Sequence, residues 1–205
     1  PWFVASVVIC LCSTLVYLRY STPIYSTSAK ILIKEQDNYR GKSSTPLSDV
    51  MELATINLTS LFDNEVEILK SKTLIKKAVS DLGLYIIHSQ RRPLGYDPQY
   101  YKNPPVQVYM APEDADKLSG KIGLRMLYDG KVLTVHSCYT NKKKEQVVEE
   151  STFTEFPALL STDYGYITFT PDSDFVPEET MDLLADIHNP RKTASDYQAS
   201  MTITP

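Results

Sequence analysis

The hydrophobic pattern is densest at the start of the chain, where residues 2–18 (WFVASVVICLCSTLVYL) carry no charge. An uncharged apolar run of this length predicts a membrane-spanning helix, because a surface helix of a globular protein keeps a polar face. At about 1.5 Å rise per residue the run reaches roughly 25 Å, slightly less than the ~30 Å hydrocarbon core. The chain begins at Pro1 without a methionine, so we expect a fragment that lacks its first helical turn.

Two alternatives to a membrane-spanning helix are a buried core helix and a cleaved signal peptide. A signal peptide requires small residues at its cleavage site, and Arg19-Tyr20 occupies that place. Membrane orientation does not follow from charge, because only one flank is visible; on that flank Arg19 and Lys30 favour the cytoplasm.

Beyond this run the hydrophobic period changes twice. Residues 25–34 (YSTSAKILIK) alternate between apolar and polar, which predicts a half-buried strand. Residues 50–69 repeat apolar positions at three- and four-residue steps, which predicts an amphipathic helix. Ser71 interrupts this stripe and is a suitable cap for a second helix over 72–82, which Gly83 would end.

The second half of the chain has the alternation of strands. Val106 to Met110 predicts a short strand, and Asp129-Gly130 between the alternating segments 121–128 and 131–138 predicts a hairpin. Residues 164–170 and 198–204 predict further strands, and residues 181–188 predict a strand or a short helix. A strand, then helices, then many strands predict an α+β fold with a mostly antiparallel sheet.

Composition narrows the function classes. The net charge of −4 and the pI near 5.4 argue against nucleic acid as a partner. Cys10 and Cys12 lie within the apolar run and Cys138 stands alone, so cysteine usage predicts no disulfide framework.

Three segments together resemble one known family. The first is residues 23–33 (PIYSTSAKILI), where the apolar run leads directly into the predicted strand. The second is residues 64–84 (NEVEILKSKTLIKKAVSDLGL), and the third is His188-Asn189-Pro190 with Ala194, Tyr197 and a strand over 201–203. These segments resemble the Wzz-type chain-length determinants of bacterial polysaccharides, a family that includes the extracytoplasmic part of capsular and exopolysaccharide tyrosine kinases. The residues that carry the resemblance are Pro23, Tyr25, Glu67, Lys70, Ser71, Gly83, Asn189 and Pro190.

The resemblance implies a bacterial inner-membrane protein with a periplasmic domain that forms a ring of identical subunits. Its implied partners are the membrane, a lipid-linked polysaccharide, and the polymerase or export machinery for that polysaccharide. We expect a transmembrane helix over 1–19, a base domain over 20–105, an inserted or enlarged β lobe over 106–180, and return strands of the base domain over 181–205. A second membrane helix and a cytosolic nucleotide-binding part would lie beyond Pro205.

Catalytic, cofactor and metal sites are not predicted. Phosphate-cradling loops, paired catalytic carboxylates and nucleophile elbows do not occur as motifs in the sequence. His136 and Cys138 share one strand face, but two ligands without others more often serve packing. Tyr96, Tyr100 and Tyr101 are candidates for stacking on sugar rings, since tyrosine combines an apolar face with a polar hydroxyl.

The leading hypothesis is a non-enzymatic, membrane-anchored, oligomeric scaffold that regulates the chain length or export of a surface polysaccharide. One alternative is the input module of a membrane tyrosine kinase for polysaccharide synthesis. Another is a glycan-binding lobe on a membrane anchor, formed by residues 106–171. An extracytoplasmic hydrolase is the weakest hypothesis.

Overall fold

The computed structural model describes residues 2–20, 26–30, 66–91, 99–100, 102–173, 175, 177 and 179–203. The chain divides into two units, residues 22–71 and the remainder of the chain. Within 22–71, residues 66–69 are helical, whereas residues 26–30 have no regular structure and pair with no described strand. The strand predicted over 25–34 is therefore wrong in its described part, because a strand requires a hydrogen-bonded partner. Most of the helix predicted over 50–69 lies outside the described residues.

Helix α1 (Trp2–Tyr20) confirms that the opening apolar run is helical. Its side chains are exposed from Trp2 to Leu18, including Trp2 at 90 % and Tyr17 at 70 %. Among the helices of the described residues, none has both the length and the hydropathy that crossing a membrane requires. The membrane crossing predicted from the sequence is thus not confirmed and stays a prediction.

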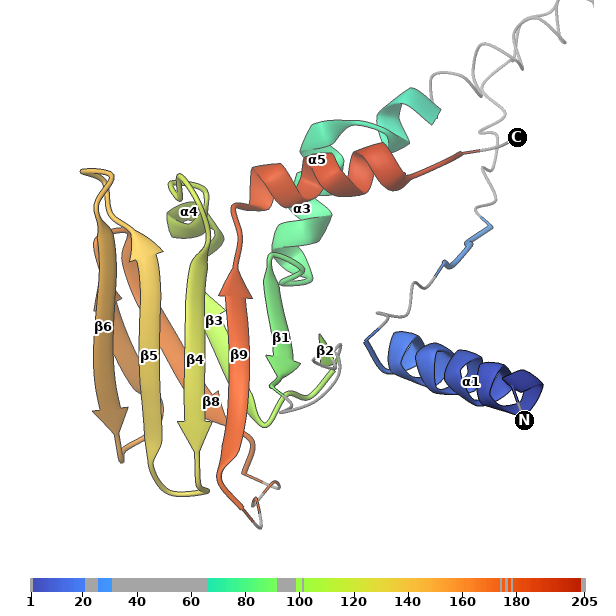
Figure 1. Ribbon diagram of the computed structural model, residues 1–205. Coiled ribbons are helices and arrows are strands. Elements are labelled where there is room, and N and C mark those ends of the chain that lie inside the picture. The colour runs from blue at the N-terminus through green and yellow to red at the C-terminus, as the bar shows by residue number, and fades with distance from the viewer. Residues whose placement is uncertain are drawn as a thin grey trace, which may run out of the picture. The chain divides into compact units, whose positions relative to one another are not determined.

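A six-stranded antiparallel sheet forms the larger layer of the fold, in the order β2-β1-β9-β4-β5-β6 (Figure 1). Strand β9 lies in the interior of this sheet and pairs with both β1 and β4. It therefore connects β1 and β2 to the strands β4, β5 and β6. The strands are β1 (Ile86–Gln90), β2 (Gln99–Tyr100), β4 (Ile122–Tyr128), β5 (Leu133–Thr140), β6 (Gln146–Phe153) and β9 (Met181–Ile187).

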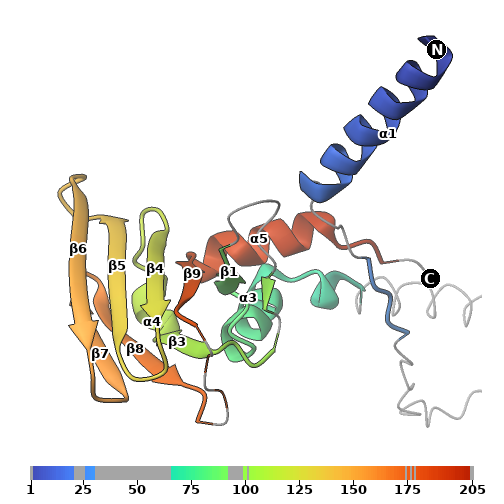
Figure 2. The same ribbon diagram turned by 60° about the horizontal axis from the view of Figure 1, so that its bottom comes forward.

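A second antiparallel sheet, in the order β3-β8-β7, packs against one face of the larger sheet (Figures 1 and 2). Its strands are β3 (Val106–Met110), β7 (Ala158–Thr162) and β8 (Gly165–Pro171). Alternate residues of both sheets point inward and are almost fully buried, and the Phe153 and Phe169 rings stack across the interface at 6.0 Å. The core includes Val106, Val108, Met110, Ile122, Leu124, Met126, Leu133, Val135, Ile167, Phe169, Leu183 and Ile187. The predicted α+β class with antiparallel pairing is confirmed.

The predicted hairpin is confirmed as β4 and β5, with Tyr128 paired to Leu133. Its turn is longer than the two residues expected. Asp129 Oδ1 accepts hydrogen bonds from the backbone N–H groups of Lys131 at 2.8 Å and Val132 at 2.7 Å. Gly130 has a φ of +94°, a conformation that favours glycine.

Helices α3 (Lys72–Asp81) and α5 (Pro190–Ser200) pack together at one end of the sheets, and the short helix α4 (Pro112–Ala115) precedes β4 (Figure 1). Gly83 ends α3 as predicted, with a φ of +65°. The Leu84 N–H donates to the Val79 carbonyl at 3.0 Å and the Gly83 N–H to the Ser80 carbonyl at 3.3 Å, which is the Schellman pattern.

The strand predicted over 198–204 is wrong in its described part, residues 198–203, and so is the strand over 201–203 that was part of the family resemblance. Residues 190–200 form α5, and residues 201–203 have no regular structure. The alternation in MTI (201–203) is typical of a strand, but the helix that begins after Asn189 continues to Ser200, and neither sheet of the described residues includes residues 201–203. Of residues 181–188, which the sequence left as strand or helix, residues 181–187 form strand β9.

Candidate functional site

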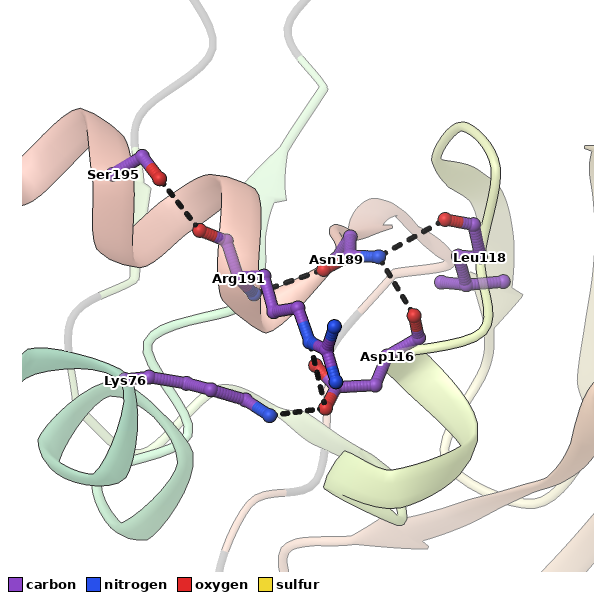
Figure 3. A network of polar contacts seen from close by, with 6 residues as sticks. All are labelled: Lys76, Asp116, Leu118, Asn189, Arg191 and Ser195. Carbon is purple, nitrogen blue, oxygen red and sulfur yellow. Dashed lines mark hydrogen bonds and ion pairs between the residues drawn. The ribbon is translucent and has the colours of Figure 1, made fainter. Parts of the chain in front are cut away.

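Asn189, which directly precedes helix α5, joins this helix to the β-sandwich (Figure 3). Asn189 Oδ1 accepts from the Arg191 N–H at 2.9 Å and caps the N-terminus of α5, while Pro190 fills the first turn, where its lack of an N–H has no cost. Asn189 Nδ2 donates to the carbonyls of Asp116 at 2.9 Å and Leu118 at 3.0 Å. One side chain thus fixes α5 against the connection between α4 and β4.

Asp116 adds a charged contact to the same junction. Its Oδ2 pairs with Lys76 Nζ of α3 and lies 3.6 Å from Arg191 Nε of α5, while Oδ1 is buried and has no hydrogen-bond partner (Figure 3). The carboxylate therefore lies between two cations that belong to different helices. This arrangement orients the helix pair on the sandwich, which is a structural task.

Two polar side chains, half-buried His88 and buried Tyr85, connect the first part of the larger sheet to strand β3 of the smaller sheet. His88 on β1 accepts at Nε2 from the Val108 N–H of β3 at 3.2 Å, and burial lowers the pKa of His88 to about 4. The Tyr85 hydroxyl donates to the Met110 carbonyl of β3 at 2.6 Å. Burial, together with nearby Tyr109, raises the pKa of Tyr85 to about 12, so both groups are neutral at physiological pH.

Three other residues that carried the family resemblance precede α3 in the sequence. Ser71 directly precedes α3, and Lys70 closes the helical turn 66–69 with its N–H on the Val66 carbonyl at 3.0 Å. Glu67 is exposed on that turn. Four predicted residues lie outside the described residues: Pro23, Tyr25, Tyr96 and Tyr101.

Tyr100 is the one described member of the three tyrosines proposed to contact sugars. It lies on the two-residue edge strand β2, is half-buried against the core, and donates its hydroxyl to Gln90 Oε1 at 3.1 Å. Its ring therefore serves packing at the edge of the sheet.

His136 and Cys138 lie on the outward face of β5, as their spacing predicts. His136 Nδ1 is 3.8 Å from Glu150 Oε2, and Cys138 Sγ accepts from Gln146 Nε2 at 3.2 Å. Within the described part of the chain, no three potential ligands come together for a metal ion.

The outward face of the six-stranded sheet, which we call the charged face, carries ion pairs between neighbouring strands. Arg125 of β4 and Asp182 of β9 form a two-pronged pair, with Nη2 to Oδ2 at 2.8 Å and Nε to Oδ1 at 3.0 Å. A second ion pair links Lys121 Nζ, just before β4, to Asp186 Oδ2 of β9 at 2.9 Å. The charged side chains named here on the charged face therefore pair with one another.

The outward face of the three-stranded sheet, which we call the tyrosine face, has different chemistry. Tyr109 of β3 and Tyr166 of β8 are 56 % and 66 % exposed, and Leu159 of β7 is 61 % exposed. The register places Tyr109 and Leu159 on either side of Thr168, and Tyr166 two residues away on the same strand as Thr168. The remaining outward residues are Gln107, Ser161 and Thr170.

Sequence reasoning predicted the strands that carry Tyr109 and Tyr166 but did not single out these residues. The signal was present in the alternation, because inward Val108 and Ile167 place their neighbours outward. Only the pairing of β3 with β8 brings the two rings to one surface.

Comparison with protein families connects the N-terminal part of the chain to a known function. Residues 1–82 match the family model of Wzz, the chain length determinant protein. The resemblance to the Wzz family is confirmed over these residues. The match includes α1 and α3 and ends before Gly83, so the strands of the sandwich lie outside it. A search of curated proteins found no match.

The family that residues 1–82 match is described as a chain length determinant, which connects this segment with the regulation of polysaccharide chain length. The junction at Asn189 joins the end of the Wzz-matching segment, α3, to the sandwich through Asp116 and Lys76. The tyrosine face lies on the part of the chain that the match does not cover.

Proposed function

We propose that this chain is a membrane-anchored, oligomeric scaffold that regulates the chain length or export of a lipid-linked bacterial surface polysaccharide. The soluble part would lie in the periplasm, next to the polymerase or export machinery. No catalytic step is assigned to these residues. The chain would act by holding partners and the growing polymer together.

The observation that carries this proposal is the match of residues 1–82 to the Wzz family model. It covers the apolar helix α1 and the amphipathic helix α3 in one continuous segment. A random similarity limited to apolar residues would not extend through the charged segment 64–82 (NEVEILKSKTLIKKAVSDL). Chain-length regulation therefore has support from residues of both polar and apolar character.

Membrane anchoring draws its support from α1. Residues 2–18 carry no charge, which favours contact with lipid over contact with water. Large apolar side chains are exposed along its whole length, for example Phe3, Ile9 and Leu15. A helix that is apolar all round is typical of an apolar environment such as lipid.

The oligomer draws its support from the family alone, and we propose it as the means by which several chains act on one polymer. Rings of identical subunits have head-to-tail interfaces that close through rotation. One such ring would hold one polymerase or exporter.

The experiment that tests anchoring and assembly compares the full chain with a variant that carries Ile9→Lys and Leu11→Lys. Each lysine near the centre of a membrane helix costs about 2.5–3.5 kcal/mol of insertion free energy. The full chain is expected to remain with the membranes after alkaline extraction and to cross-link into species larger than a dimer. The lysine variant is expected to be extracted and to cross-link poorly.

A matched control replaces Cys10 and Cys12 by alanine, which keeps the run apolar. This control should behave as the unmodified chain does. Release of the unmodified chain by alkaline extraction, or a monomer in the membrane at all expression levels, would contradict the proposal.

A further inference from the structure

We infer that the tyrosine face binds an uncharged stretch of polysaccharide, with Tyr109 and Tyr166 stacking on successive sugar rings. This inference rests on the proposed function, because that function brings a polysaccharide to the chain. It adds a binding site and a ligand class: neutral sugars, held by two aromatic rings and the hydroxyl and amide groups between them.

The Tyr109 and Tyr166 rings lie close enough together for one glycan chain to contact both. Tyr109 is paired with Thr168, and Tyr166 is two residues from Thr168, so the tyrosines are diagonal neighbours on adjacent strands. Such positions are about 7–8 Å apart, which is within reach of aromatic side chains. The strands that carry them are anchored by buried Val108, Ile167 and Phe169, so the rings stand on a rigid support.

The polar groups of the face match the surface of a sugar. Tyrosine presents an apolar ring face to the C–H side of a pyranose and keeps its hydroxyl available for hydrogen bonds. Thr168 lies between Tyr109 and Leu159, and Gln107, Ser161 and Thr170 surround them. Hydroxyl and amide side chains both donate and accept, as sugar hydroxyls do.

The charge of the face selects the ligand. Strands β3, β7 and β8 are fully described, and none of their seven outward residues named above is charged. A neutral glycan that binds here would cover no charged side chain of this face, so no charge would be buried without a partner. The charged face on the other side of the sandwich also carries hydroxyl groups, such as those of Thr134 and Thr152, but it differs in presenting ion pairs between its strands.

The area of the face argues for a thin ligand and against a second copy of the chain. Three strands of about five residues cover roughly 14 by 17 Å, or on the order of 250 Å². A stable protein interface buries about 800 Å² on each partner. A linear glycan can cross such a small face and leave the rest of the molecule free.

The test is native affinity electrophoresis of the full chain in detergent, in gels that contain one of three neutral polymers (dextran, laminarin or mannan) or the anionic polymer alginate. At least one neutral polymer is expected to retard the unmodified chain. Each ring is expected to contribute about two- to tenfold in affinity, so Tyr109→Ala with Tyr166→Ala should weaken retardation about four- to hundredfold. Tyr166→Phe keeps the ring and is expected to retain most of the retardation.

The matched control is Tyr197→Ala, which removes another exposed tyrosine, 47 % exposed, from helix α5. It should leave retardation unchanged. Three results would overturn the inference: retardation by none of the neutral polymers, equal retardation of the double variant, or retardation by alginate alone. A change of oligomeric state in the double variant, without a change of retardation, would assign the face to a second copy instead and would likewise overturn it.

Failure of this inference is distinguishable from failure of the proposed function. Membrane retention and cross-linking of the chain test the scaffold without any glycan, whereas electrophoresis tests the face without any assembly in cells. If the chain stays in the membrane and cross-links but does not bind neutral polymers, the scaffold proposal stands and the glycan site is wrong.

Discussion

The two outward faces of the sandwich use the same alternation of residues for different chemistry. The charged face pairs Arg125 with Asp182 and Lys121 with Asp186, so its polar groups are satisfied within the protein. The tyrosine face has two exposed rings and several hydroxyls without any charge. The difference teaches that exposure alone does not mark a binding surface. What matters is whether the exposed groups have already found partners in the same chain.

The two faces stay distinct only while the two sheets pack back to back. The largest effect is therefore expected at His88, whose side chain joins the two sheets. His88 has a pKa of about 4 in the folded chain, below its ordinary value of 6.5. Between these values the unfolded state binds more protons, so stability is present above pH 6.5 and is lost as pH falls toward 4. The expected loss is on the order of 3 kcal/mol, measured by urea unfolding at several pH values.

The matched control for this pH dependence is His88→Gln. The glutamine Oε1 can still accept from the Val108 N–H, but it does not titrate. The variant should therefore lose much less stability over the same pH range. An equal loss in both proteins would assign the acid sensitivity to other groups and would remove His88 from the account.

The next largest effect is expected at the end of the sandwich. Asn189→Ala removes the cap of α5 and leaves the carbonyls of Asp116 and Leu118 without their amide donor. A cap is worth about 1 kcal/mol and a buried carbonyl left without a partner costs about 1–3 kcal/mol, so we expect a loss of about 2–3 kcal/mol.

The comparison variant for this site is Asn189→Ser, which restores the cap but not the two donated bonds. It should recover about 1 kcal/mol of the loss, because serine is a good N-cap. Urea unfolding measures both variants. If Asn189→Ala matched the unmodified chain, the junction would not hold α5 to the sandwich.

The smallest effect is expected on the charged face. Arg125→Ala removes the two-pronged pair with Asp182, yet the arginine side chain is 45 % exposed to solvent. Exposed pairs contribute little and are screened by salt, so we expect a small loss of stability that disappears in 1 M NaCl. Thermal unfolding in low and high salt measures it. Loss of retardation on neutral polymers by this variant would break the comparison between the faces.

Much of the fold could be predicted from the sequence because local patterns decide it. Asp129-Gly130 between alternating segments indicated the β4–β5 hairpin, and Gly83 indicated the end of α3. Residues 181–187 remained ambiguous, since a central strand that pairs with β1 and β4 is set by partners far away in sequence. The strand expected after residue 198 failed for the same reason, because alternation does not create a partner.

The candidate sites depended even more on tertiary structure. Tyr100 resembled a sugar contact in sequence, but its position on the edge strand β2 turns it toward Gln90. Tyr109 and Tyr166, 57 residues apart by their numbers (166 − 109), meet only through the pairing of β3 with β8. Sequence spacing carries no information on such a meeting. Asn189-Pro190 was singled out by resemblance, and its physical role became visible only with the carbonyls of Asp116 and Leu118.

The measurement that tests the central claim most directly is the length distribution of the surface polysaccharide in host cells that lack this gene, resolved on gels with and without the gene supplied again. Chain-length regulation by this protein predicts a broad, unregulated distribution without the gene and a narrow band of preferred lengths when the gene is restored. The same length distribution in both strains, with the protein present in the membrane of the restored strain, would contradict chain-length regulation by this protein.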